Sequence, residues 1–150
     1  VQKHNKFSME LHPIDFYLPQ KRPFIMVDKI QSVSLHECQT EFNVSGQNIM
    51  VHDGELSESG LLENIAQTCA THVGYIEIHI RNAQHIRIGM VAQIKSLEIN
   101  RYPRVGDLII THVTEKENYG DVSIYDAVMT IGEEEIATGE FRVILTDKIN

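Results

Sequence analysis

The sequence lacks the features that define several large classes of protein. No apolar run approaches the ~20 residues that a membrane-spanning helix requires. Cysteine is scarce, and Cys38 and Cys69 have neither metal-site nor redox spacing. We therefore expect both cysteines to be small core residues and the protein to reside in a reducing cytoplasm. The first residues contain no hydrophobic signal region, and we therefore expect no export.

Positive charge is also scarce. The chain has 13 Lys and Arg against 21 Asp and Glu, a formal net charge of −8. Non-specific binding to nucleic acid depends on clustered basic side chains, so this balance argues against it. The 150 residues fit one domain, 1–150, that can bury about two thirds of its unfolded surface without metal or disulfide help. Within it, residues 1–12 are expected to be a mobile N-terminal segment.

The longest helical pattern lies between residues 57 and 81. Apolar or small residues recur there with the i, i+3, i+4 spacing of a helix that buries a broad face. From residue 57 to residue 74 the only formal charges are Glu58 and Glu63. The other polar residues are uncharged types that hydrogen bonds can satisfy in a buried setting. The pattern therefore predicts a central, largely buried helix.

Glu63 is the unusual residue of this helix. A carboxylate among Leu61, Leu62 and Ile65 would lose hydration, which favours a neutral group that can donate a proton near pH 7. Gln67, one turn further on, is placed to hold it. The helix pattern is equally compatible with a Glu63 that points into solvent.

Most of the remaining chain is predicted to form strands. Residues 25–35 and 38–44 form a hairpin, and four longer strands follow the helix over 88–100, 107–116, 121–131 and 135–146. Turns between those four predict an antiparallel meander. Two strands, one helix and four strands make an α+β fold, an antiparallel sheet of about six strands wrapped around one helix.

Three segments resemble motifs of the β-hydroxyacyl-acyl carrier protein dehydratases of fatty acid synthesis. Leu18–Ile30 (LPQKRPFIMVDKI) is similar to the N-terminal motif, Leu61–Gln67 (LLENIAQ) to the central-helix motif, and Ile94–Asp107 (IKSLEINRYPRVGD) to the third strand and its following turn. The motifs occur in the family's order and cover most of the chain. The resemblance implies the hotdog fold and a dimer with its active site between subunits.

The resemblance also implies a reaction. In that family a 3-hydroxyacyl thioester on phosphopantetheine loses water to give the trans-2-enoyl product. A His removes the C2 proton, while the helix Glu of the other subunit protonates the departing C3 hydroxyl. Here Glu63 matches that Glu, Gln67 supports it, and a backbone N–H at the helix start, at Gly60, would bind the thioester oxygen. No metal or nucleotide cofactor is implied.

The loop before the helix departs from the family pattern. Its Gly-His-Phe-Pro segment and Pro-Gly pair are replaced by NIMVHDGELSESG, residues 48–60. His52 is the candidate base, with Asp53 as its orienting partner or itself the base. His72, nine residues beyond Glu63, is predicted on roughly the opposite helix face. The Asp-Gly pair is closer to a divergent branch associated with aryl polyene and similar pigment pathways, in which an active site can be altered or supplied by a partner.

Three functions remain open. The first is an enzyme, a 3-hydroxyacyl-[acyl carrier protein] dehydratase, which the retained Glu63 and Gln67 favour. The second is a catalytically lapsed thioester-binding subunit that pairs with an active hotdog homologue, and the missing Gly-His-Phe-Pro segment favours it. The third is a hotdog thioesterase, in which a helix carboxylate activates water. The expected partners are acyl carrier protein or a coenzyme A thioester, with Lys21, Arg22, Arg101 and Arg104 as candidate docking residues for an acidic carrier.

Overall fold

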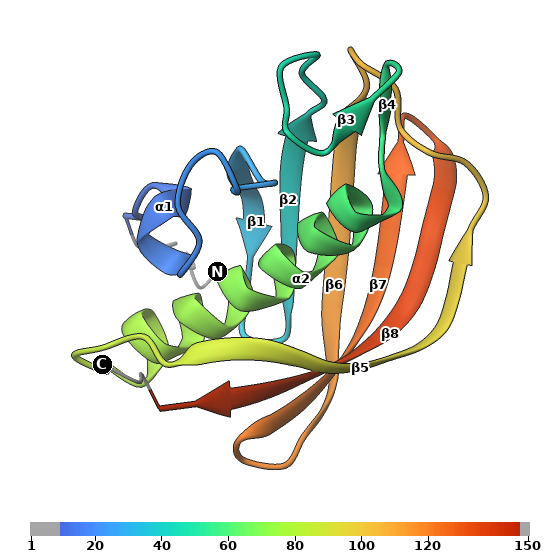
Figure 1. The fold of residues 1–150 in the computed structure, drawn as a ribbon. Coiled ribbons are helices and arrows are strands. Elements are labelled where there is room, and N and C mark those ends of the chain that lie inside the picture. Colours follow the sequence, from blue (N-terminus) through green and yellow to red (C-terminus); the bar gives the residue numbers. More distant parts are fainter. Residues whose placement is uncertain (1–9, 148–150) are drawn as a thin grey trace, which may run out of the picture.

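A six-stranded antiparallel sheet curls around one long helix (Figure 1). The computed structural model describes residues 10–147. Its elements are α1 (Ile14–Tyr17), β1 (Lys29–Val33), β2 (Glu37–Asn43), β3 (Val51–His52), β4 (Glu55–Leu56), α2 (Glu58–Tyr75), the π-helical turn η1 (Ile76–Ile80), β5 (Ile88–Ile99), β6 (Leu108–Asn118), β7 (Val122–Ile131) and β8 (Glu134–Thr146). The α+β architecture predicted from the sequence is confirmed. The segment 1–12 predicted to be mobile lies mostly outside the described residues.

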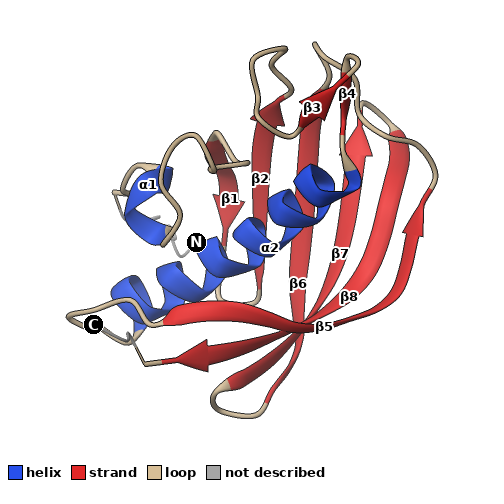
Figure 2. Cartoon of the chain, in the orientation of Figure 1, coloured by secondary structure: helices blue, strands red, loops and turns tan. Residues whose placement is uncertain are grey.

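The strands present one face to the helix and one to the surroundings. In β2 the buried residues Cys38, Thr40 and Phe42 alternate with more exposed neighbours, the period of two that the sequence predicted. Figure 2 shows α2 lying along the concave side of the sheet. There the inward side chains of the strands and the apolar side chains of α2, such as Leu61 and Ile65, form one core.

The strand order is β1-β2-β6-β7-β8-β5, which corrects the predicted four-strand meander. Of the four strands after the helix, β6, β7 and β8 follow one another as neighbours, whereas β5 pairs with β8 at the far edge. The segment between β5 and β6 contains the predicted turn, in which Asp107 N–H donates to Arg104 O at 2.9 Å, but it does not join neighbouring strands. Its backbone also bonds to other parts of the chain: Val105 N–H donates to Gly54 O at 3.0 Å and Gly106 N–H to Val44 O at 2.9 Å. These contacts carry the chain across the end of the sheet.

The central helix has the predicted extent. Ser57 caps its start by accepting a hydrogen bond from Gly60 N–H, and η1 prolongs it to Ile80, close to the predicted end at Arg81. No helix in residues 10–147 is long and apolar enough to cross a membrane.

Both cysteines are core residues, as predicted. Cys38 and Cys69 are free thiols and almost fully buried. Burial raises the pKa of Cys38 to about 12 and also raises the pKa of Cys69. Both thiols are therefore neutral and unreactive at physiological pH.

Candidate active site

Glu63 and Gln67 lie one turn apart on α2 and are hydrogen-bonded. Gln67 Nε2 donates to Glu63 Oε2 at 2.9 Å, the contact expected from their i, i+4 spacing. Gln67 is fully buried, whereas Glu63 is half-buried. The carboxylate thus sits at the edge of the core, between the two placements that the helix pattern allowed.

The orientation of Gln67 is fixed by the extended segment before β1. Its Oε1 accepts from Met26 N–H at 2.7 Å, and its Nε2 also donates to Phe24 O at 2.9 Å. Phe24 O can only accept a hydrogen bond and Met26 N–H can only donate one, so the oxygen and the nitrogen of the Gln67 amide cannot exchange places. Both Nε2 hydrogens are therefore committed, one of them to Glu63 Oε2. Among the described residues, Glu63 Oε1 has no hydrogen-bond partner.

Asn64 completes this attachment, and the sequence analysis did not identify it. Its Nδ2 donates to Met26 O at 2.6 Å and its Oδ1 accepts from Thr111 Oγ1 at 2.5 Å. Asn64 and Gln67 together hold both backbone groups of Met26, so the segment that resembles the N-terminal dehydratase motif is tied to the helix that carries Glu63. The sequence signal that could have revealed this role was the uncharged amide of Asn64 on a helix face that is otherwise largely apolar.

His52 and Asp53 lie on the short β3–β4 hairpin just before α2. Asp53 (φ 52°) and Gly54 (φ 76°) form its turn, the positive-φ pair typical of tight hairpins. His52 is exposed and pairs with Glu55 across the hairpin. Within residues 10–147 no hydrogen bond joins His52 or Asp53 to Glu63, so their roles remain predictions.

Gly60 lies in the first turn of α2, in a place that admits no side chain. A Cβ there would lie 2.5 Å from Leu56 Cδ1 and 2.8 Å from Met50 Cβ. Its N–H donates to the capping Ser57 Oγ at 3.2 Å. The N–H groups of Glu58 and Ser59 come before it and have no partner inside the helix. The thioester-binding role of Gly60 stays a prediction.

The four candidate docking residues occupy two separate segments and are partly engaged by acids. Arg22 pairs with Asp15 of α1 at 3.2 Å, and Lys21 next to it is exposed. The other pair lies between β5 and β6, with Arg101 bound to Glu134 at 2.9 Å and to Asp107 at 3.3 Å, and Arg104 lying 3.9 Å from Glu55. Their docking role remains a prediction.

His72 lies at a different place from Glu63, in agreement with its predicted helix face. It is fully buried, with Nδ1 at 2.7 Å from the Tyr125 hydroxyl and Nε2 at 3.1 Å from Ser34 O. These partners belong to β7 and to the turn after β1, whereas the Gln67 bonded to Glu63 contacts residues 24–26. His72 is therefore part of the core.

The stability of the fold is expected to fall below about pH 6.5 because of His72. Burial lowers the pKa of this imidazole from its ordinary value of 6.5. The unfolded state therefore binds more protons as the pH falls through this range, and protonation favours unfolding. Between pH 7.5 and pH 5.5 the urea midpoint of the wild type should decrease by more than that of His72→Gln. The control His85→Gln, at an exposed histidine, should show the same decrease in midpoint as the wild type. An equal decrease in midpoint for all three proteins would contradict the assignment of this pH dependence to His72.

An antiparallel sheet wrapped around one long central helix defines a hotdog protein. The chain belongs to the ApeP-like family: the family model described as ApeP dehydratase matches residues 12–150. A curated relative, the 3-hydroxyacyl-[acyl-carrier-protein] dehydratase FabZ of Clostridioides difficile (strain 630), is 24% identical over 146 residues, covering 93% of this chain and 99% of that protein. The divergent dehydratase branch expected from the Asp-Gly pair is confirmed.

Solved structures support the same fold. The dehydratase heterocomplex ApeI:P from Xenorhabdus doucetiae aligns with a TM-score of 0.84 at 16% identity, over 93% of this chain and 94% of that one. A hypothetical thioesterase with coenzyme A from Streptococcus pneumoniae TIGR4 aligns with a TM-score of 0.64 at 12% identity, over 81% and 88%. The shared hotdog fold therefore includes proteins described as dehydratases and as thioesterases.

Proposed function

We propose that this chain is a cytoplasmic hydro-lyase subunit that removes water from 3-hydroxyacyl thioesters carried on acyl carrier protein. The observation that carries the proposal is the fixed Glu63–Gln67 pair, because it commits one carboxylate oxygen as an acceptor and leaves the other able to hold a proton. Elimination of a hydroxyl group needs such an acid, since hydroxide is a poor leaving group. The phosphopantetheine arm belongs to the carrier, and no metal or nucleotide cofactor is needed.

In the proposed reaction a base removes a proton from C2 and the electron pair of that bond forms the C2–C3 double bond. The C3–O bond breaks as Glu63 transfers its proton to the hydroxyl oxygen, so water leaves and Glu63 becomes a carboxylate. Backbone N–H groups at the start of α2, at Gly60 or just before it, bind the thioester oxygen while negative charge develops there. Proton exchange with solvent then restores the acid and the base.

The source of the base distinguishes two forms of the proposal. His52, oriented by Asp53, supplies it in a homodimer, whereas a second hotdog chain supplies it in a heterodimer. The replacement of the family's Gly-His-Phe-Pro segment by residues 48–60 favours the heterodimer. So does the fold's similarity to a complex described as a dehydratase heterocomplex. In either form Lys21, Arg22, Arg101 and Arg104 are proposed to meet the acidic carrier.

The test is mass spectrometry of 3-hydroxyacyl-carrier thioesters of several lengths, incubated with the purified chain alone and with a second dehydratase-type hotdog chain. Loss of water with the chain alone, abolished by His52→Ala, supports the homodimer. Loss of water only in the mixed sample, and beyond that of the second chain alone, supports the heterodimer. Release of free acid instead identifies a thioesterase, and an intact thioester in every sample contradicts the proposal.

A further inference from the structure

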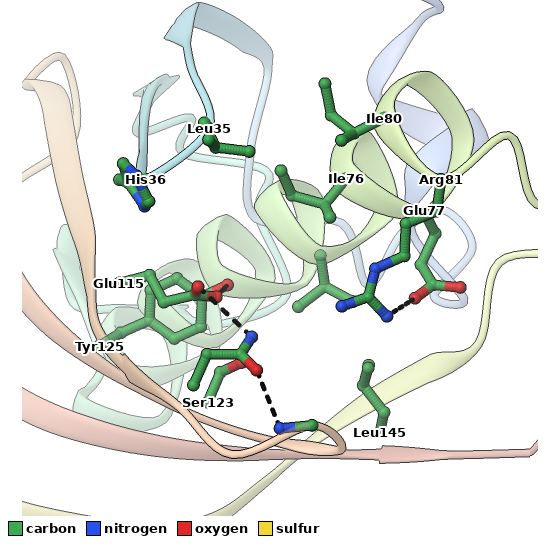
Figure 3. A pocket seen from close by; sticks show the side chains of 13 residues that line it. Leu35, His36, Ile76, Glu77, Ile80, Arg81, Glu115, Ser123, Tyr125 and Leu145 are labelled. Atoms are coloured by element: carbon green, nitrogen blue, oxygen red, sulfur yellow. Dashed lines mark hydrogen bonds and ion pairs between the residues drawn. The ribbon is translucent and has the colours of Figure 1, made fainter.

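A cavity of about 200 Å³ lies at the C-terminal end of α2, between that helix, the β1–β2 turn and the β6–β7 hairpin (Figure 3). The apolar residues that line it are Leu35, Val73, Ile76, Ile80 and Leu145. The polar residues that line it are His36, Glu77, Arg81, Glu115, Asn118, Ser123 and Tyr125. Val73 is ten residues beyond Glu63, or about 15 Å along the helix, so the cavity and the Glu63–Gln67 pair are well separated.

The hydrogen bonds of His72 determine where the Tyr125 proton goes. His72 Nε2 faces two carbonyl oxygens, Ser34 O at 3.1 Å and Leu35 O at 3.2 Å, and therefore carries a hydrogen. Burial lowers the pKa of His72, so the ring is neutral and Nδ1 has a free lone pair. The Tyr125 hydroxyl at 2.7 Å must donate to Nδ1.

This assignment leaves two acceptors facing each other at the cavity wall. The one hydroxyl hydrogen of Tyr125 is used by His72, yet its oxygen lies only 3.3 Å from Glu115 Oε2. Asn118 Nδ2 reaches the other Glu115 oxygen at 3.4 Å, a long contact. A donor that could bond to both Tyr125 O and Glu115 Oε2 would satisfy them together.

Glu115 also differs from Glu77, the other carboxylate that lines the cavity. Glu77 is paired with Arg87 at 3.1 Å and with Arg81 at 3.5 Å. Over residues 10–147, by contrast, no Lys or Arg forms an ion pair with Glu115. The cavity therefore combines an apolar wall with one carboxylate that lacks a cationic partner.

We propose that this cavity binds a small protonated amine with a short apolar group. The ammonium donates to Glu115 Oε2 and to Tyr125 O, and the apolar group packs on Leu35, Ile76 and Ile80. A carboxylate ligand is disfavoured, because Arg81, the guanidinium that also lines the cavity, is paired with Glu77 at 3.5 Å while Glu115 carries a negative charge that is unpaired among the described residues. The inference does not depend on the proposed dehydration, since it uses none of the residues assigned to that reaction.

The test is an NMR titration of the isotopically labelled full chain with n-butylammonium, alongside n-butanol and butyrate as probes of equal chain length. Saturable shifts of the amides around the cavity are expected with n-butylammonium, with about tenfold weaker binding of butanol and no binding of butyrate. Equal affinity for butanol and n-butylammonium, or binding of butyrate, would overturn the proposal on the wild-type protein alone.

Two variants and one control locate the binding. Glu115→Gln should weaken n-butylammonium about tenfold, because it replaces a charge-assisted bond with a neutral one. Ile80→Trp should remove binding by filling the cavity mouth without touching the polar groups. Glu117→Gln, an exposed carboxylate on the same strand, should bind as the wild type does. Equal weakening by Glu115→Gln and Glu117→Gln would reveal only general attraction to an acidic surface, and would refute the site.

Discussion

Glu63→Gln is expected to lower the rate of water loss by about 10²–10⁴ in whichever assembly, homomeric or heteromeric, shows the reaction. A glutamine cannot transfer a proton to the departing hydroxyl. Its amide oxygen can still accept from Gln67 Nε2, which in the wild type donates to Glu63 Oε2 at 2.9 Å. The fold and acyl binding should therefore survive while the chemistry is lost.

The measurement is single-turnover dehydration followed by mass spectrometry, together with binding of a thioester that lacks the C3 hydroxyl. Glu58→Gln serves as the matched control, because Glu58 is an exposed carboxylate in the first turn of the same helix. Turnover of Glu63→Gln at the rate of the Glu58 control would exclude Glu63 as the acid. A loss of thioester binding would instead assign Glu63 to binding.

Gln67→Met is expected to lower the free energy of unfolding by about 2–5 kcal/mol. Methionine approximates the volume of the buried glutamine but forms none of its bonds to Met26 N–H, Phe24 O and Glu63. Met26 is itself fully buried, so its N–H loses its partner in a place that water does not readily reach.

The measurement is chemical denaturation at neutral pH, with Thr71→Val as control. Thr71 Oγ1 makes one hydrogen bond, to the backbone oxygen of Gln67, in the next turn of the same helix. Loss of this hydrogen bond should lower the free energy of unfolding by about 1 kcal/mol. If Gln67→Met were no more destabilising than Thr71→Val, the attachment of residues 24–26 to α2 would not be an important source of stability.

The local patterns of the sequence were sufficient for most of the elements. A period near 3.6 and the scarcity of charge predicted the central helix, and alternation predicted β2 and the four later strands. Both signals act between residues close in the chain, which is why a single sequence reveals them. The Glu63–Gln67 contact was predictable for the same reason, since residues four apart on a helix are neighbours.

The tertiary structure alone decided which distant segments meet. β5 pairs with β8, and the β5–β6 connection contacts Val44 and Gly54; no local pattern encodes either set of contacts. The attachment of Met26 to Asn64 and Gln67 spans about forty residues of chain. The contact of His72 with Tyr125 spans 53 residues.

The sequence by itself determined the helix, most of the strands and the candidate acid, because these follow from short-range periodicity and a recognisable motif. The strand order, the support of the acid and the cavity near Glu115 depend on long-range packing, which brings together side chains that carry no signal of one another in the sequence.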